Sequence, residues 1–200
     1  FSEQFESIEY LLLAPPETAP MVNPYLVAFF QEHIVILDNV LYDVFVFNLS
    51  GDFITRIDSK GKGPGEFIHA TDLQFREDTI LIKDNVLKKI IAFDFEGNFR
   101  FELKEDLQST SFYWGEQHTI HFMDNYVDTK NFNFITKVKR GESSYSYPIK
   151  TGFEGIGFWS NTGFMPDPQS IEIYFNVPFS YDIAVFGLNG EMNRVIHFDF

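Results

Sequence analysis

The sequence predicts an all-β protein, namely a β-propeller made of four-stranded antiparallel blades. Short runs alternate apolar and polar residues along the chain, and 25 Phe among 200 residues favour sheets over helices. A hairpin with glycine in its turn recurs at Gly51 and Gly97, which lie 46 positions apart. A four-stranded unit that repeats every 40 to 50 residues or so is typical of a propeller blade.

Each hairpin consists of an apolar run, a short turn that contains glycine, and a second run. The three copies are FNLSGDF at 47–53, FDFEGNF at 93–99 and FGLNGEM at 186–192. Glycine suits such a turn because it adopts positive φ at low steric cost. Gly190 follows Gly97 by 93 positions, about twice the period, so we expect a further turn near position 143, where Gly141 lies.

A second repeated element is a strand that ends in the pair Asp-Asn. The pairs begin at Asp38, Asp84 and Asp124, so the first spacing is 46 and the second is 40. For the first unit these signals together predict four strands, at about 25–30, 33–38, 43–48 and 52–58.

We expect a single, incomplete propeller domain over residues 1–200 with about four blades. A ring with more blades needs more chain, and the sequence stops on a strand, so we expect it to be part of a longer polypeptide. The expected parts are an N-terminal strand and linker at 1–24, a blade at 25–59, a connector at 60–72, and blades at 73–106, 107–151 and 152–200.

The connector KGKGPGEF at 60–67 resembles the GxGPGEF motif of the NHL-like six-bladed β-propeller proteins of bacteria with an outer membrane. Many of these proteins carry lipoprotein signals and have no assigned function. The opening FESIEYLLLAPPE and the final VPFSYDIAVFGLNGEMNRVIHFDF also resemble that family. The resemblance implies a six-bladed ring in which the N-terminal strand completes the last blade. It implies export to the periplasm or outer membrane, with a lipid anchor outside this chain, and it implies no reaction.

Composition excludes several classes of partner. The net charge of −14 disfavours binding to nucleic acid or to anionic lipid. The absence of cysteine excludes disulfides and thiolate metal sites. No apolar run approaches the roughly 18 residues of a membrane helix. We therefore expect no nucleic-acid partner and no membrane-spanning segment.

The connector GKGPGE at 61–66 is not a nucleotide-binding loop. A phosphate loop needs Gly-Lys-Ser/Thr followed by a helix, whereas Gly-Pro follows Lys62 and a strand is expected after Phe67. The sequence favours a structural link between two blades. The alternative is that the loop lines a ligand-binding mouth, with Lys62 and Glu66 as contacts.

The repeated Asp residues allow two interpretations. Inner strands line the channel of a propeller, so Asp38, Asp84 and Asp124 could converge on a divalent cation. Asp and Asn are also ordinary turn residues, because their side chains bond the nearby backbone, and we favour this interpretation. The five histidines form no metal set along the sequence. We predict no cofactor and keep a divalent cation as the alternative.

Aromatic residues interrupt the regular pattern in the third and fourth units. Tyr113, Trp114 and Trp159 could form a stacking platform for a sugar or a peptide, or they could fill the core between blades. The favoured function is a non-enzymatic binding or scaffold module of the cell envelope, whose partner is an unknown glycan, peptide or envelope protein. The alternative is a metal-dependent propeller hydrolase or lyase that acts through channel-facing Asp, Glu and His residues.

Overall fold

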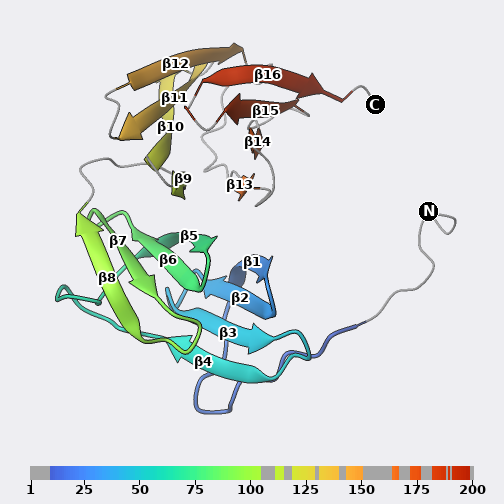
Figure 1. The fold of residues 1–200 in the computed structure, drawn as a ribbon, viewed down its shortest axis with the longest axis vertical. Coiled ribbons are helices and arrows are strands. Elements are labelled where there is room, and N and C mark those ends of the chain that lie inside the picture. Colours follow the sequence, from blue (N-terminus) through green and yellow to red (C-terminus); the bar gives the residue numbers. More distant parts are fainter. Residues whose placement is uncertain are drawn as a thin grey trace, which may run out of the picture. The chain divides into compact units, whose positions relative to one another are not determined.

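The computed structural model divides the chain into two compact units, Phe1–Lys104 and Glu105–Phe200 (Figure 1). All regular structure in the described residues is β, and none of their segments forms a helix that could span a membrane. The residues described are 10–104, 111–114, 119–128, 131–139, 143–150, 164–166, 172–176, 182–187, 189 and 191–198.

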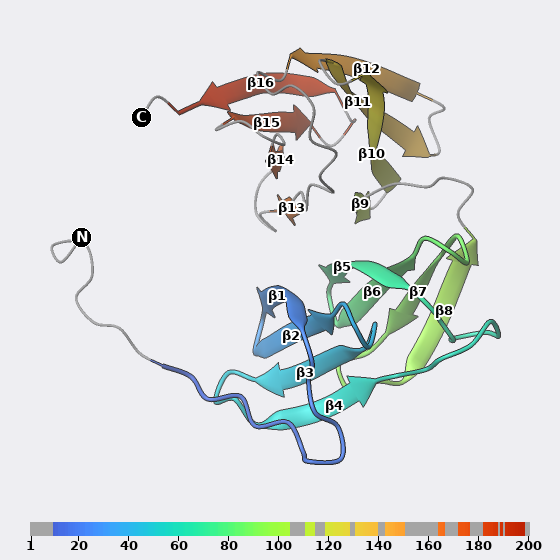
Figure 2. The ribbon, with the colours of Figure 1, turned by 180° about the vertical axis from the view of Figure 1, so that it is seen from behind.

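The first unit contains two four-stranded antiparallel sheets, each with its strands in sequence order (Figures 1 and 2). The strands of the first sheet agree with the predicted ones to within a residue at each end. In the second sheet β5 begins inside the stretch that was expected to be connector. The strands are β1 Pro24–Phe30, β2 His33–Asp38, β3 Val44–Asn48, β4 Phe53–Ile57, β5 Ala70–Arg76, β6 Thr79–Asp84, β7 Lys89–Phe93 and β8 Phe99–Lys104.

The second unit contains two further antiparallel four-stranded sheets, also in sequence order. The predicted turn at Gly141 falls between β11 and β12, outside the described residues. Asp124 lies within β10 and pairs with Phe134, so it does not end its strand as expected. The strands are β9 Ser111–Trp114, β10 Thr119–Asp128, β11 Asn131–Lys139, β12 Ser143–Lys150, β13 Phe164–Pro166, β14 Glu172–Asn176, β15 Asp182–Gly187 and β16 Met192–His197.

The period of 46 residues extends to the backbone conformation of the first unit. Three positions in the first sheet have positive φ, and the residue 46 positions later has nearly the same angle. Two of the three are not glycine, so the turns themselves, and not only their residue types, are repeated. The pairs are Gln31 (51°) and Glu77 (53°), Tyr42 (55°) and Lys88 (53°), and Gly51 and Gly97 (both 87°).

The two sheets of the first unit pack face to face around an apolar core. Strand β2 contributes Val35 and Leu37, whose side chains are completely buried. The rings of Phe30 and Phe75, from β1 and β5, stack with their centroids 5.3 Å apart. Buried apolar area is the main stabilising contribution to such a contact between sheets. The core also contains Val44, Val46, Ile57, Phe67, Ala70, Leu73, Ile80, Ile82, Ile91, Phe93 and Phe95.

The opposite face of the first sheet is covered by the N-terminal segment 10–23. Ile34 and Ile36 alternate with the residues of the first core, as the two-residue period of a strand requires, and are 2% exposed. Ala19 and Met21 of the segment pack against them. Because both faces of β2 are covered, this strand has a continuous apolar run in sequence and no simple alternation.

Candidate ligand-binding face

The candidate site is the end of the first unit where β2 and β6 end. It consists of the segment 20–23 before β1, the turns 39–43 and 85–88, and the connector 58–69. We call this region the connector end, and the glycine hairpins lie at the opposite end of both sheets. Loops held on a rigid sheet scaffold are common sites of binding residues.

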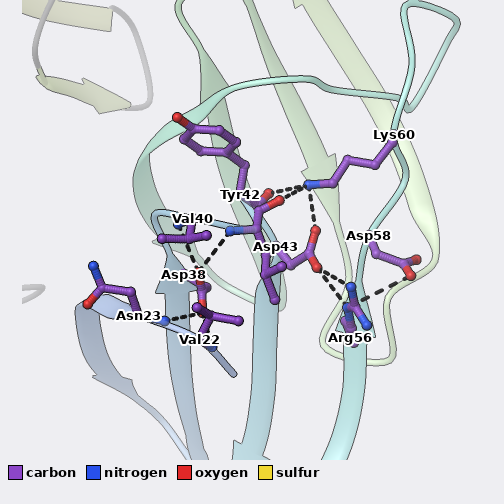
Figure 3. Close-up of polar contacts among 10 residues, drawn as sticks. Val22, Asn23, Asp38, Val40, Tyr42, Asp43, Arg56, Asp58 and Lys60 are labelled. Atoms are coloured by element: carbon purple, nitrogen blue, oxygen red, sulfur yellow. Dashed lines mark hydrogen bonds and ion pairs between the residues drawn. The ribbon is translucent and has the colours of Figure 1, made fainter. Parts of the chain in front are cut away.

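Asp38 fixes the backbone at the connector end of the first sheet (Figure 3). The N–H groups of Val22 and Asn23 donate to its Oδ2 at 2.6 and 2.7 Å. The N–H groups of Val40 and Leu41 donate to its Oδ1, both at 2.9 Å. One buried carboxylate therefore joins the segment that enters β1 to the turn that follows β2.

Asp84 makes the same four contacts 46 residues later. Its Oδ2 accepts from the N–H groups of Ile68 and His69 at 2.7 and 3.1 Å. Its Oδ1 accepts from those of Val86 and Leu87, both at 2.8 Å. Every donor lies 46 positions after its counterpart in the first sheet, so this carboxylate clamp is part of the repeated unit.

The clamp geometry leaves little room for a cation at these two carboxylates. Burial opposes ionisation of Asp38, but the four N–H donors outweigh it and lower the pKa of its carboxyl. A carboxylate has about four lone-pair sites, and all four are occupied at Asp38 and at Asp84. The side chain of Asp124 lies outside the described residues. Within the described residues, no three His, Asp or Glu side chains lie together as a metal site.

The connector loop binds carboxylates of its own chain. The Gly63 N–H donates to Oε2 of Glu66 at 2.8 Å, and the Gly65 N–H donates to Oε2 of Glu102 at 3.1 Å. Lys89 Nζ donates to the Gly63 carbonyl at 2.9 Å, and the completely buried ring of Phe67 anchors the loop in the core. The loop therefore has backbone donors for anions, as a phosphate loop has, but Glu66 and Glu102 occupy them.

Gly65 shows why the loop contains glycine. Its φ of 72° is a conformation that other residues rarely adopt, and a Cβ there would lie 2.8 Å from the ring of Phe99. The backbone of the connector thus lies directly against an aromatic side chain of β8, which fixes the loop to the second sheet.

An ion-pair network around a buried carboxylate ties the connector to the first sheet (Figure 3). The completely buried carboxylate of Asp43 accepts from Arg56 Nε at 2.8 Å and pairs with Lys60 Nζ at 2.5 Å. Lys60 Nζ also donates to the carbonyls of Leu41 and Tyr42, at 2.6 and 2.9 Å. A buried charge requires such partners because desolvation is costly.

The second sheet carries the equivalent pair with the charges exchanged. Lys89 is 46 positions after Asp43, and Glu102 is 46 positions after Arg56. Lys89 Nζ and Glu102 Oε2 are 2.8 Å apart. The hydrogen bond from Lys89 lowers the pKa of Glu102, and the Gly65 N–H lowers it further against the effect of burial. Sequence reasoning missed these four residues, although opposite charges at matching repeat positions are a signal that could have identified them.

The predicted ligand contacts have different surroundings. Lys62 is exposed at the tip of the connector, whereas Glu66 is half-buried and turned into its own loop. Tyr113 and Trp114 are half-buried in β9 of the second unit. Trp159 lies outside the described residues, so whether the three aromatic residues form one platform stays a prediction.

Comparisons with known proteins give the fold and the family. The model of the DUF5128 family, described as a "6-bladed beta-propeller", matches residues 1–200. No curated protein matches the chain by sequence. Among solved structures, a "putative exported protein" from Bacteroides fragilis is 20% identical with a TM-score of 0.73, over 96% of this chain and 55% of its own.

Two further solved structures show the same architecture. A member of the DUF4221 family from Bacteroides vulgatus is 12% identical with a TM-score of 0.62, over 94% of this chain and 61% of its own. A streptogramin B lyase is 12% identical with a TM-score of 0.50, over 90% of this chain and 56% of its own. The chain therefore spans little more than half the length of these structures. At such identities they show the fold alone.

The four-stranded antiparallel sheets, the period of 46 residues in the first unit and the family match over the whole sequence agree with one another. The six-bladed ring implied by the resemblance is confirmed at the level of the family, while the NHL-like relationship and the GxGPGEF motif stay predictions. The chain belongs to the DUF5128 family of six-bladed β-propellers.

Proposed function

We propose that this protein is a non-enzymatic binding or scaffold propeller of the bacterial cell envelope, and that its ligand docks at the connector end. The observation that carries the proposal is that the aspartates of this end are buried while two of its lysines are exposed. Asp38, Asp43 and Asp84 are buried and bonded inward, while Lys62 and Lys88 are exposed. This arrangement favours a rigid recognition surface over a centre for acid–base chemistry.

Rigidity supports binding in physical terms. Charge-assisted hydrogen bonds to Asp38 and Asp84 hold the two turns, and Lys60 and Lys89 hold the connector between the sheets. A surface that is ordered before its ligand arrives loses little conformational entropy on binding. The same bonds count against the metal-dependent alternative, because a cation would have to displace backbone donors at each carboxylate.

Export is the second part of the proposal. It rests on the resemblance of the connector motif to envelope proteins and on the name of the Bacteroides fragilis structure. Cell fractionation of the native host checks it, with the protein expected in the periplasm or outer membrane. Labelling with a palmitate analogue tests for the lipid anchor. Recovery in the cytoplasm contradicts this part of the proposal and leaves the binding part standing.

The binding proposal is tested with purified full-length protein on glycan and peptide arrays, together with elemental analysis for bound metal. We expect saturable binding of at least one ligand class, no conversion of that ligand, and the same urea midpoint with and without EDTA. A stoichiometric metal, a lower midpoint in EDTA and turnover of a bound ligand would together establish the hydrolase or lyase alternative. The variant Lys62→Glu tests whether the ligand binds at the connector end, and we expect it to weaken binding.

A further inference from the structure

We propose that the connector end of the first unit binds an extended acidic peptide with apolar side chains. The inference rests on the proposed binding function and names its ligand. The contacts are the apolar tips Val22, Val40 and Val86 and the exposed lysines Lys62 and Lys88.

The apolar tips are the first observation. Val22, Val40 and Val86 are 57%, 56% and 59% exposed. Val40 and Val86 occupy the same position of the repeated turn, 46 residues apart. Asn, Asp, Gly and Ser are the usual residues of turns because each helps the backbone to reverse, and an exposed valine gives no such help. Single exposed apolar residues are ordinary, but the same residue repeated at one turn position points to a contact.

The backbone of these tips is fixed, which is the second observation. Val22 and Val40 both donate their N–H groups to Asp38, and Figure 3 shows the two residues on either side of that carboxylate. Val86 donates its N–H group to Asp84 in the same way. The clamps therefore hold the valines in place for contact, and little entropy remains to be lost when a ligand covers them.

The third observation is the local charge. The protein as a whole carries a net charge of −14. In the segments that form the connector end, however, the exposed charged side chains are Lys60, Lys62 and Lys88 against Asp58 alone. Lys60 is paired with Asp43, which leaves Lys62 and Lys88 for a partner. An acidic ligand is attracted to such a region and is held by opposite charge.

A peptide fits this combination better than the other acidic ligands. An acidic glycan offers carboxylates without aliphatic side chains to cover three valines. A nucleic acid or an anionic membrane extends beyond the connector end and so meets the repulsion of the whole protein, whereas a short peptide contacts the connector end alone. An extended peptide presents alternate side chains on one face, so acidic and apolar residues can both reach groups on neighbouring sheets.

The test uses the full-length protein and a short fluorescein-labelled peptide, the Glu-Val peptide, read by fluorescence anisotropy. It repeats Glu-Ser-Val-Ser, because only every second side chain of an extended peptide lies on the same face. Two control peptides replace Glu by Lys or Val by Ser. We expect saturable binding of the Glu-Val peptide that weakens with salt, and about tenfold weaker binding of each control peptide. Equal binding of a control peptide overturns the inference.

Variants place the peptide at the connector end. Val40→Ser and Val86→Ser are each expected to weaken binding about fivefold, since each removes one partly buried apolar contact. The double variant Lys62→Gln with Lys88→Gln should weaken binding and flatten its salt dependence. The matched control is Leu49→Ser, because Leu49 is 46% exposed at the opposite, hairpin end. Urea midpoints equal to wild type show that each variant is folded.

The outcomes separate this inference from the proposed function. Unchanged binding in the valine and lysine variants, or an equal loss in the Leu49 control, overturns the inference. Failure of the peptide to bind, with a glycan bound on the array, overturns the inference and leaves the binding function standing. Turnover of a ligand together with a bound metal contradicts both.

Discussion

Replacement of Asp38 by Asn tests whether the carboxylate clamp stabilises the propeller. Asp38 accepts four backbone N–H groups, from Val22, Asn23, Val40 and Leu41. Asparagine has nearly the same shape but only one oxygen, so it satisfies two donors and directs an NH2 group at the other two. A hydrogen bond to a charged group contributes about 1.5–3 kcal/mol. Because two such bonds are lost, we expect Asp38→Asn to lower the free energy of unfolding by about 3–6 kcal/mol.

That loss is a large part of the total stability of a typical domain, about 5–15 kcal/mol. It is measured from the shift of the urea midpoint, provided that the slope of the free energy against urea concentration is unchanged. The matched control is Asp58→Asn, because the side chain of Asp58 is 60% exposed and its contact with Arg56 is long, at 3.8 Å. We expect the control to shift the midpoint little, as exposed ion pairs do. A loss below about 1 kcal/mol for Asp38→Asn refutes the clamp.

The pH dependence gives a second check on the same variant. The pKa of Asp38 is lower in the folded protein than its ordinary value of about 3.9. A depressed pKa contributes stability above the unfolded value, and this contribution is lost as the pH falls through the folded pKa. The difference between wild type and Asp38→Asn should therefore be full at neutral pH and shrink below about pH 4. A difference that stays constant in acid contradicts the ionic character of the clamp.

Three further predictions concern the connector and the ion pairs. Gly65→Ala should lower the free energy of unfolding in urea by about 2 kcal/mol, because position 65 has positive φ and a Cβ there clashes with Phe99. An unchanged urea midpoint would mean that the loop is not fixed at this position. Lys89→Met should lower the free energy of unfolding by about 3 kcal/mol and raise the pKa of Glu102, measured by NMR titration. The double variant with Glu102→Leu should recover most of the lost stability. Arg100→Ala should leave the urea midpoint unchanged, because its ion pair is exposed, and a clear shift would contradict that description.

The strands of the first unit could be predicted because their signals are local and repeated. The turn at Gly51 and the end of β2 at Asp38 recur 46 residues later, so each sheet supported the interpretation of the other. In the third sheet the spacing shortens to 40, and there Asp124 is found inside a long strand. The change in spacing therefore coincides with a strand that continues past its Asp-Asn pair and forms a long hairpin with β11.

The clamp and the ion pairs were harder to predict, for different reasons. The sequence favoured a turn role for Asp38, but it could not show that Val22, 16 residues earlier, donates to the same oxygen as Asn23. The pair of Asp43 and Arg56 joins the turn before β3 to β4, 13 residues later, and its only trace in the sequence is the exchanged pair of charges 46 positions on. Such contacts depend on register, which is set by the packing of whole sheets and by turn geometry.

The exchange of charges between the two sheets explains how the connector can be held on both sides. On the first sheet the acid Asp43 belongs to the turn and attracts Lys60 at the start of the connector. On the second sheet the equivalent position is Lys89, the first residue of β7, which binds a connector carbonyl, and Glu102 binds a connector N–H. If both sheets carried an acid at this position, the Gly63 carbonyl would face a carboxylate. Because the charges are reversed, one glycine-rich loop can bind to both sheets through its own side chains and backbone, without a phosphate.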